Sequence, residues 1–403
     1  MRSSKQSDES PMNSHDQDAT SATRDGLPTA LIWRMRLLPA SETFIRSQGE
    51  ALRRFSPFYV GRRRVPGLEV PANQSWTINE GSFWGLLKEI RFLYQGPGKR
   101  LARTLAARRP ALVHAHFGVD SCRAVKIASQ LGIPLISTFH GYDATLQDFA
   151  LQGFRDGRYY LKTRHMLQKS GGHFVAVSEF IRRRLAAQGF PLERTSVQYI
   201  GVDLKQFSYS PQNGQKQDVL FVGRLVEQKG CKLLIRAFEQ LQAEFPAASL
   251  TIIGDGKNRG LLERQAARSL RRYSFLGSQS PEAVREHLRQ AAVFCVPSIP
   301  GPNGDTEGFG IVFAEAQASG VPVVSFSNGG IPEAVSHGTT GFLAETGDWR
   351  GLARYIALLL NDLNLRQKFS RAGRCHVETN FDLEKQTAKL EDLYCHIVRK
   401  SRR

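Results

Sequence analysis

The clearest indication of the fold is the stretch VLFVGRLVEQKG, residues 219–230. Val219 to Val222 form a short apolar run, and a turn that contains Gly223 and Gly230 leads from it into a stretch with the spacing of an amphipathic helix. A strand that passes through a glycine turn into a helix is typical of β-α-β units, whose parallel strands are buried on both faces. We therefore predict an α/β protein.

The same alternation continues through most of the 403 residues, a length that exceeds one typical hydrophobic core. A polar segment with Pro and Gly at 205–217 predicts a linker. We expect two doubly wound, Rossmann-like domains, 28–204 and 218–385, whose carboxyl strand ends face a central cleft. The predicted strands are 30–37, 111–115, 134–138, 174–177, 219–222, 250–253, 275–276, 293–296 and 323–326, and the predicted helices are 121–130, 158–169, 230–244, 258–269, 281–290 and 310–319.

The two ends of the chain and its cysteines bear on location. Residues 1–27 are rich in Ser, Asp and Gln and have no apolar core of a signal peptide, which predicts a disordered tail, and 386–403 predict a C-terminal helix with a basic tail. No apolar run reaches the ~18 residues of a membrane-spanning helix. Five scattered cysteines without a C-x-x-C pair indicate buried thiols in a reducing compartment. We expect a cytoplasmic protein.

Positive charge is concentrated in the first half of the chain. The formal net charge is +18, and residues 28–204 hold 26 Lys and Arg against 12 Asp and Glu. Such an excess is either a solvated basic surface or a face that meets an anionic partner. The clusters 62–64 and 182–184 lack the interleaved aromatic residues that stack on bases. We favour an anionic membrane surface, at the inner face of the plasma membrane, and expect no nucleic acid.

The turn at 223–230 has the features of an anion site. Gly223 lets the backbone approach a ligand, and the turn leads to a helix N-terminus with free N–H groups. Arg224 and Lys229 are five residues apart and can reach one diphosphate, Arg as a planar fork and Lys as a point charge. The alternative is an ordinary glycine turn with two solvated cations.

A second motif, DTEGFGIVFAE at 305–315, places two carboxylates eight residues apart. Glu307 precedes a predicted helix N-terminus, beside the N–H groups of Gly308, Phe309 and Gly310, and Glu315 follows about two turns later, ~10 Å away. This arrangement suits a ligand with hydroxyl groups at both ends and phosphates between, such as a nucleotide sugar. The alternative is a cap carboxylate and a solvated Glu.

Together these motifs resemble a known family. FVGRLVEQKG, GDG, FLGSQS, EGFGIVFAEAQASGVPVV, GGIPEAV and GFL occur in this order, and over 111–382 the chain resembles the retaining glycosyltransferases of family 4, which have the GT-B fold. The resemblance implies that Glu307 contacts the donor sugar and Glu315 the ribose. It also implies a diphosphate held by Arg224 and Lys229, sugar or phosphate contacts from Phe309 and Gly310, and a base bordered by Gly277 and Ser278.

The first half supplies candidates at two strand ends. His114 and His116 end one predicted strand, and His140 and Asp143 follow the next, so both ends face the cleft. The resemblance implies that His140 lies next to the sugar as a catalytic residue, and we expect His116 and Asp143 on the acceptor or phosphate side. For His114 a core position is favoured. A zinc site is rejected because no H-E-x-x-H motif or cysteine ligand accompanies these histidines.

One loop departs from many family members. After the first strand the chain has P-x-S-E-T-F instead of a Gly-Gly loop, as in members that resemble exopolysaccharide and colanic-acid enzymes. We expect Ser41, Glu42 and Thr43 to cap the following helix, with Glu42 in its first turn, close to the acceptor or a phosphate.

The resemblance implies a hexosyltransferase that moves a sugar from a nucleotide-diphosphate sugar to a saccharide acceptor linked to polyprenyl diphosphate, in exopolysaccharide or other cell-surface polysaccharide synthesis. No cofactor and no metal ion are expected. One alternative is a sugar transferase with a soluble acceptor. Another, of a different class, is a nucleic-acid- or membrane-binding protein with an inactive cleft, and the fold alone also allows an epimerase or a phosphorylase.

Overall fold

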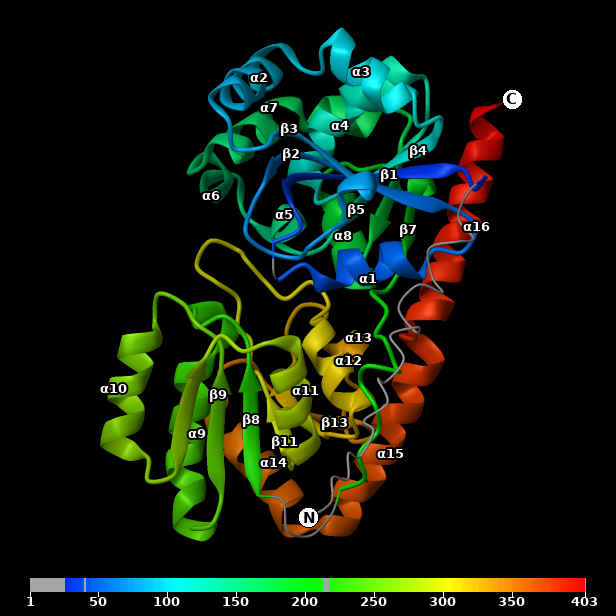
Figure 1. Cartoon of the computed structure of the whole chain (residues 1–403). Coiled ribbons are helices and arrows are strands. Elements are labelled where there is room, and N and C mark those ends of the chain that lie inside the picture. Colours follow the sequence, from blue (N-terminus) through cyan, green and yellow to red (C-terminus); the bar gives the residue numbers. More distant parts are fainter. Residues whose placement is uncertain (1–25, 40, 213–216, 403) are drawn as a thin grey trace, which may run out of the picture.

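The structure, a computed structural model, describes residues 26–402 except 40 and 213–216. Most of the predicted tail, residues 1–25, therefore lies outside the described residues. Figure 1 shows two α/β domains stacked one above the other, with a long helix, α16, running along one side of both. No described helix combines the length and the apolar character needed to cross a membrane.

The first domain is built on a seven-stranded sheet with the order β3-β2-β1-β4-β5-β6-β7. All its strand pairs are parallel, and the chain changes direction across the sheet between β1 and β4. The strands are β1 Thr29–Leu37, β2 Ser56–Arg64, β3 Ser75–Asn79, β4 Pro110–His116, β5 Leu135–Phe139, β6 His173–Ala176 and β7 Thr195–Val197. The helices are α1 Thr43–Ala51, α2 Phe83–Gln95, α3 Lys99–Ala106, α4 Gly118–Leu131, α5 Tyr142–Thr145, α6 Asp148–Gln152, α7 Arg155–Lys169 and α8 Glu179–Ala187.

The second domain repeats this plan with a six-stranded parallel sheet, β10-β9-β8-β11-β12-β13, which reverses between β8 and β11. Ligands of open parallel sheets bind at such reversal points, beyond the carboxyl ends of the strands. The strands are β8 Asp218–Val222, β9 Ser249–Ile253, β10 Tyr273–Gly277, β11 Val293–Cys295, β12 Val323–Phe326 and β13 Gly341–Ala344. The helices are α9 Cys231–Glu244, α10 Arg259–Ser269, α11 Pro281–Gln290, α12 Ile311–Ala318, α13 Ile331–Ala334, α14 Trp349–Asn361, α15 Leu363–Asn380 and α16 Leu383–Ser401.

The predicted strands and helices all coincide with observed ones, and the two doubly wound sheets confirm the predicted fold class. Four described strands were not predicted: β2, β3, β7 and β13. β7 (TSV) contains a single apolar residue and β13 (GFLA) contains no β-branched residue, so neither shows the valine-containing apolar run of the equally short strands that were predicted. β2 ends in three arginines, which the sequence alone presents only as a surface cluster.

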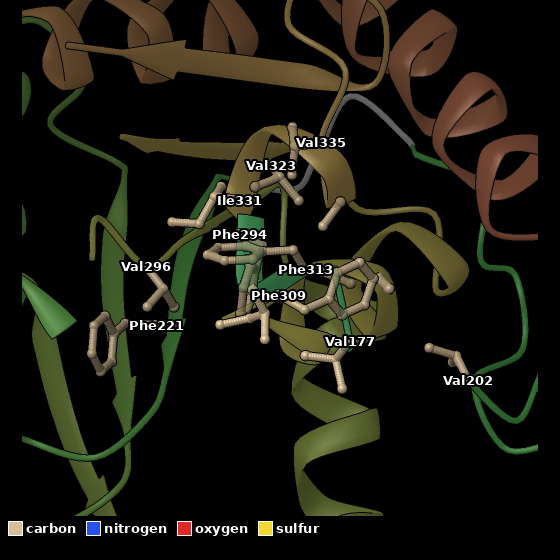
Figure 2. Close-up of a cluster of buried hydrophobic side chains, with 14 of the residues drawn as sticks. Val177, Val202, Phe221, Phe294, Val296, Phe309, Phe313, Val323, Ile331 and Val335 are labelled. Carbon is tan, nitrogen blue, oxygen red and sulfur yellow. The ribbon is translucent and has the colours of Figure 1, made fainter. Parts of the chain in front are cut away.

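A buried aromatic cluster anchors the segment that carries the second sequence motif. Phe309 and Phe313 lie beside Phe294 of β11 (Figure 2), and each is almost fully buried. The same cluster includes Val177 and Val202 from the first half of the chain. The backbone around Phe309 is therefore fixed between the two domains by packing.

The C-terminal helix α16 returns to the first domain. The Glu391 carboxylate accepts hydrogen bonds from the backbone N–H groups of Arg53 and Arg54, at 2.9 and 2.6 Å. Tyr394 places its hydroxyl 2.5 Å from Nδ1 of His114. The end of the chain thus braces the domain that comes first in sequence.

Candidate active site

A pocket of about 170 Å³ lies between the two domains, beyond the carboxyl ends of β4, β5, β8 and β11. Both sheets therefore contribute to one site, as facing Rossmann-like domains predict. The lining residues are Phe117, His140, Gly141 and Tyr142 of the first domain and Arg224, Val226, Gln228, Lys229, Ser298, Asp305, Thr306, Glu307 and Gly308 of the second.

The two domains touch directly at the edge of this pocket. A Cβ atom on Gly308 would lie 2.1 Å from the His140 carbonyl oxygen, so a glycine is needed for the backbones to approach this closely. Ser178 donates a hydrogen bond of 2.6 Å to the Gly308 carbonyl. Glu333 of α13 accepts from the first backbone N–H groups of α8, those of Glu179 and Phe180, at 2.7 and 2.8 Å.

Lys229 and Glu307 form an ion pair at the pocket wall, with 2.5 Å between Nζ and Oε2. Lys229 ends a single 3-10 turn, Glu227–Lys229, and Gly230 follows with a φ of +66°. A Cβ atom on Gly230 would lie 1.8 Å from the Pro297 carbonyl oxygen, so this turn also requires glycine. The predicted cation and the predicted carboxylate thus meet, although 78 residues separate them.

Asp305 adds a third charged group beside this pair. Burial raises the pKa of its carboxyl, and Arg224 acts in the opposite direction. Arg224 is exposed and follows β8 directly, in the turn that also contains Gly223. The pocket therefore brings two cations and two carboxylates together at the end of one sheet.

Glu315 lies on α12, which begins after Gly310, a residue with a φ of +80°. Burial raises the pKa of Glu315 to about 7, and the positive charge of Arg285 opposes the rise. Glu315 is not among the residues that line the pocket. Of the two predicted carboxylates, only Glu307 faces His140 across the pocket.

His116 and His140 form a pair at the first-domain side. Nδ1 of His116 lies 3.0 Å from Nε2 of His140, and their rings are stacked. Burial lowers the pKa of both imidazoles well below the ordinary value, with nearby Arg34 acting in the same direction, so both are neutral at pH 7. The buried Nδ1 of His140 has no hydrogen-bond partner among the described residues.

His114 has a different position from these two. Its ring nitrogens contact Tyr394 and Thr138, and its side chain is almost fully buried. The core position favoured from the sequence is confirmed.

Asp143 acts on backbone groups. Its carboxylate accepts hydrogen bonds from the N–H groups of Gly118, His140 and Gly141, at 2.8, 3.1 and 2.9 Å, and it is 1% exposed. It therefore holds the turn after β5 that presents His140. These contacts make Asp143 a positioning residue for His140. Its place on the acceptor side stays a prediction.

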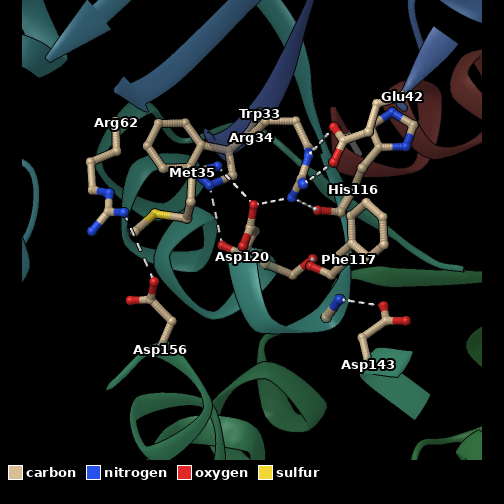
Figure 3. Close-up of polar contacts among 12 residues, drawn as sticks. Trp33, Arg34, Met35, Glu42, Arg62, His116, Phe117, Asp120, Asp143 and Asp156 are labelled. Atoms are coloured by element: carbon tan, nitrogen blue, oxygen red, sulfur yellow. Dashed lines mark hydrogen bonds and ion pairs between the residues drawn. The ribbon is translucent and has the colours of Figure 1, made fainter. Parts of the chain in front are cut away.

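A buried cluster of three charged residues lies next to the histidine pair, and two of the three, Arg34 and Asp120, were not predicted from the sequence. Arg34 of β1 forms ion pairs with Glu42 and Asp120 (Figure 3), and we call these three residues the Arg34 cluster. Arg34 also donates to the His116 carbonyl at 3.3 Å, and its guanidinium lies 4.3 Å from the centre of the Phe117 ring. The cluster thus contacts two residues of the strand end that carries the site.

Burial and pairing act against each other within the Arg34 cluster. Burial disfavours the charge of Arg34, but Asp120 and Glu42 outweigh it and raise the pKa of the guanidinium. Burial raises the pKa of Asp120 to about 6, although Arg34 lowers it. Asp120 also accepts a 2.7 Å hydrogen bond from the Met35 N–H.

The expected cap at P-x-S-E-T-F is wrong. Glu42 is itself the residue before α1, no side chain caps the helix, and the first turn contains no acidic residue. The Glu42 carboxylate is instead held by Arg34, and its side chain is buried. Ser41 is exposed and Thr43 half-buried, and an acceptor role for these three residues stays a prediction.

The remaining candidates lie at neighbouring strand ends. Gly223 follows β8 and Gly277 ends β10, and both are hydrogen bonded to the turn at the end of β9, Gly223 to Ile253 and Gly277 to Gly254. Ser278 is exposed beside Gly277. In the part of the chain that the structure describes, no group of three or more His, Cys, Asp or Glu side chains could hold a metal ion.

Comparison with known proteins places this architecture in a family. The family model "Glycosyl transferases group 1" matches residues 204–376, and "Glycosyltransferase Family 4" matches residues 49–206. An uncharacterized glycosyltransferase of Methanocaldococcus jannaschii is 30% identical over 285 residues, 70% of this chain and 74% of that protein.

Two further relatives are named for polysaccharide synthesis. A Salmonella typhimurium protein named for colanic acid biosynthesis is 31% identical over 252 residues, 60% of each chain. An Erwinia amylovora amylovoran biosynthesis glycosyltransferase is 28% identical over 66% of this chain. The match spans 60% of the length of the first and 65% of the second.

Solved structures agree on the fold. The Anabaena protein HepE in complex with UDP superposes with a TM-score of 0.73, covering 92% of this chain and 100% of that one at 19% identity. Sucrose-phosphate synthase from Thermosynechococcus elongatus gives 0.72, covering 93% and 100% at 20% identity. Matched over both halves by the two models, the chain belongs to the group 1, family 4 glycosyltransferases of GT-B fold.

Proposed function

We propose that this chain is a retaining glycosyltransferase that moves a sugar from a nucleotide-diphosphate sugar to a saccharide acceptor in exopolysaccharide synthesis. The observation that carries the proposal is the pocket in which Lys229, Arg224 and Glu307 face His140 across the two domains. Relatives named for colanic acid and amylovoran biosynthesis support the polysaccharide assignment. The UDP and glucose bound by HepE support a nucleotide-sugar donor.

The donor is assigned to the second domain. Arg224 and Lys229 neutralise the diphosphate, because they are the two cations at the carboxyl end of β8. Backbone N–H groups of Phe309 and Gly310 add donors at the start of α12, where the helix dipole favours negative charge. Glu315 accepts from the ribose hydroxyls, and Gly277 and Ser278 border the base.

The reaction breaks the bond between the anomeric carbon and the β-phosphate oxygen and forms a bond from the same carbon to an acceptor hydroxyl oxygen. The hydroxyl attacks from the side of the leaving group, and its proton passes to a phosphate oxygen, so configuration is retained without a side-chain nucleophile. Lys229 and Arg224 stabilise the negative charge that develops on the diphosphate. Glu307 and His140, which both line the pocket, orient the sugar.

The acceptor is assigned to the first domain, at the carboxyl ends of β1 and β4, where Ser41, Thr43 and His116 lie. We infer that it is a saccharide linked to polyprenyl diphosphate. No metal ion is required in this proposal, since protein cations neutralise the leaving group. The enzyme would work at the cytoplasmic face of the plasma membrane.

A thermal-shift panel of nucleotide sugars tests the donor assignment. One donor at about 100 times its Kd should stabilise the protein by about 2.7 kcal/mol. Glu307→Ala should lose this shift, and Glu345→Ala, an exposed carboxylate of the same domain, should keep it. A panel without any shift, or a shift that Glu307→Ala retains, would overturn the proposal. A shift that disappears with EDTA would refute metal independence.

The affinity for that donor should depend on pH through Glu315. The pKa of the free carboxyl is raised to about 7, and ribose hydroxyls bind the ionised form, so binding releases a proton below pH 7. We expect affinity to fall up to about tenfold per pH unit from about 7 to 5. A nucleotide sugar contains no phosphate that titrates in this window, so the change reports on the protein.

Glu315→Gln serves as the control for this titration. The variant should bind more weakly at pH 8 and should lose the dependence, because its amide does not titrate. Isothermal titration calorimetry across the window measures both curves. Parallel curves for the two proteins would show that another group is responsible.

A further inference from the structure

The helix α2 presents apolar side chains to solvent along most of its length. Phe83, Trp84 and Tyr94 are 70%, 70% and 76% exposed, and the helix buries its opposite side through Gly85, Glu89, Phe92 and Leu93. Among the large apolar side chains exposed in the described part of the chain, six of thirteen lie on these 13 residues. They are Phe83, Trp84, Leu86, Leu87, Ile90 and Tyr94.

This clustering is unusual for a helix that faces water. Positions 83, 87, 90 and 94 recur at intervals of three and four residues, so they form one stripe along the helix. Exposed apolar patches of this kind mark surfaces that meet a partner or a membrane. Tryptophan, phenylalanine and leucine on one face are typical of helices that lie in a membrane interface.

The sequence beyond this stripe is strongly basic. Between Glu89 and Asp120 the chain has six Lys and Arg and no Asp or Glu. All six are exposed, and none forms an ion pair within the described residues. They are Arg91, Lys99, Arg100, Arg103, Arg108 and Arg109. We call the apolar stripe and these cations the α2–α3 face.

The α2–α3 face leaves room for a large partner. In Figure 1, α2 and α3 lie at the end of the first domain farthest from the second domain, so the second domain does not cover them. A hollow of about 730 Å³, lined by Arg63, Arg64 and Phe83 among others, joins the start of α2 to the end of β2. β2 and β4 run in the same direction, since both are parallel to β1. This hollow at the carboxyl end of β2 therefore lies toward the same end of the strands as His116, the last residue of β4.

We propose that the α2–α3 face docks the protein on an anionic bilayer, with the apolar stripe of α2 inserted among the acyl chains and the cations against lipid headgroups. Charge complementarity favours a bilayer over an apolar protein partner, because six exposed cations without ion pairs lie on α2 and in the segment that follows it in sequence. Only the role of this docking rests on the proposed function: it would bring the acceptor side of the pocket to a lipid-linked saccharide. Docking itself requires no catalysis.

Vesicle flotation tests the docking. The full chain is mixed with vesicles of phosphatidylcholine alone or with added phosphatidylglycerol. We expect binding to the mixed vesicles and weak binding to the neutral ones. Phe83→Ser/Trp84→Ser should weaken binding by about tenfold or more, because two apolar rings no longer leave water. Arg100→Glu/Arg103→Glu should weaken it about fivefold or more for each charge, in a manner that salt abolishes.

Matched variants in the second domain are the controls. Leu261→Ser on α10 removes an exposed apolar side chain, and Arg371→Glu on α15 reverses an exposed charge. Both should bind vesicles like the wild type. Equal weakening of vesicle binding by these controls would mean that no particular face docks. Wild-type binding that does not increase when phosphatidylglycerol is added to the vesicles would also overturn the proposal. Binding to duplex DNA through Arg100 and Arg103, without binding to vesicles, would assign the face to nucleic acid.

Trp84 offers a direct signal of insertion. It is the exposed member of the four tryptophans, since Trp33 is buried and Trp76 and Trp349 are partly buried. Its fluorescence should shift to the blue and be quenched by brominated lipids, and Trp84→Phe should bind normally without that signal. The donor thermal shift should be unchanged in all these variants. If no donor stabilises the protein but vesicle binding is intact, only the proposed function is refuted. If a donor stabilises the protein but vesicles are not bound, only the docking is refuted.

Discussion

Lys229→Ala should lower the rate of nucleotide release from the donor by about a hundredfold to a thousandfold, the effect typical of removing one group that stabilises developing negative charge. Lys229 is the cation whose Nζ lies in the pocket, 2.5 Å from the Glu307 carboxylate. Its removal takes a positive charge from the leaving diphosphate. It also leaves Glu307 with a negative charge that repels the same phosphates.

The loss should appear mainly in kcat, because the charge that Lys229 meets grows as the bond to the sugar breaks. Steady-state assays with the donor found in the thermal-shift panel measure kcat and KM separately. Lys232→Ala, which removes an exposed lysine three residues further on, should stay within about twofold of the wild type. A Lys229→Ala enzyme of near-normal rate would show that the diphosphate is neutralised elsewhere.

The parts of this site that could be predicted from sequence are those formed by local rules. Gly223, Lys229 and Gly230 lie in one turn between a strand and a helix, so their mutual position follows from the strand–turn–helix pattern. The contact between Lys229 and Glu307 joins two such turns. It follows from the parallel order of β8 and β11 in the sheet, which no short stretch of sequence specifies.

The residues that were missed or misassigned depend on long-range burial. Arg34 lies in β1 among apolar neighbours, and its carboxylate partner Asp120 is 86 residues away, so nothing local marks either as paired. Glu42 lies in a stretch whose sequence predicts a helix cap, but its carboxylate is buried in an ion pair with Arg34. Arg62 has the sequence context of a solvated surface charge, yet it is partly buried and lies 3.5 Å from the Glu89 carboxylate.

Arg34→Met should lower the free energy of unfolding by about 3–5 kcal/mol, the usual cost of removing one partner from a buried ion pair. Methionine fills much of the same volume, but the Glu42 and Asp120 carboxylates then lie in the interior without a positive charge. Urea denaturation at neutral pH measures the change. Arg46→Met is the control, because the exposed Arg46–Glu50 pair within one helix should be worth about 0.5 kcal/mol or less.

The loss should depend on pH in a predictable direction. In the wild type, burial already raises the pKa of Asp120 from the ordinary 3.8 to about 6 against the attraction of Arg34. Without Arg34 the folded-state pKa rises further. A carboxyl whose folded pKa is raised favours folding fully below its unfolded value and loses that contribution as the pH rises through the folded pKa. Destabilisation by Arg34→Met should therefore be smaller at about pH 5 than at about pH 8.

The triple variant Arg34→Met/Glu42→Gln/Asp120→Asn separates charge from packing. Both amides keep the shape of the carboxylates, and the new amide oxygen at position 120 can still accept from the Met35 N–H, which lies 2.7 Å from the present carboxylate. If the uncompensated charges cause the loss, this variant should recover most of the stability and lose the pH dependence. If it is as unstable as Arg34→Met at every pH, the contribution of Arg34 comes from its contacts with the His116 carbonyl and the Phe117 ring. The cluster would then support the strand end that carries the site by packing and not by charge.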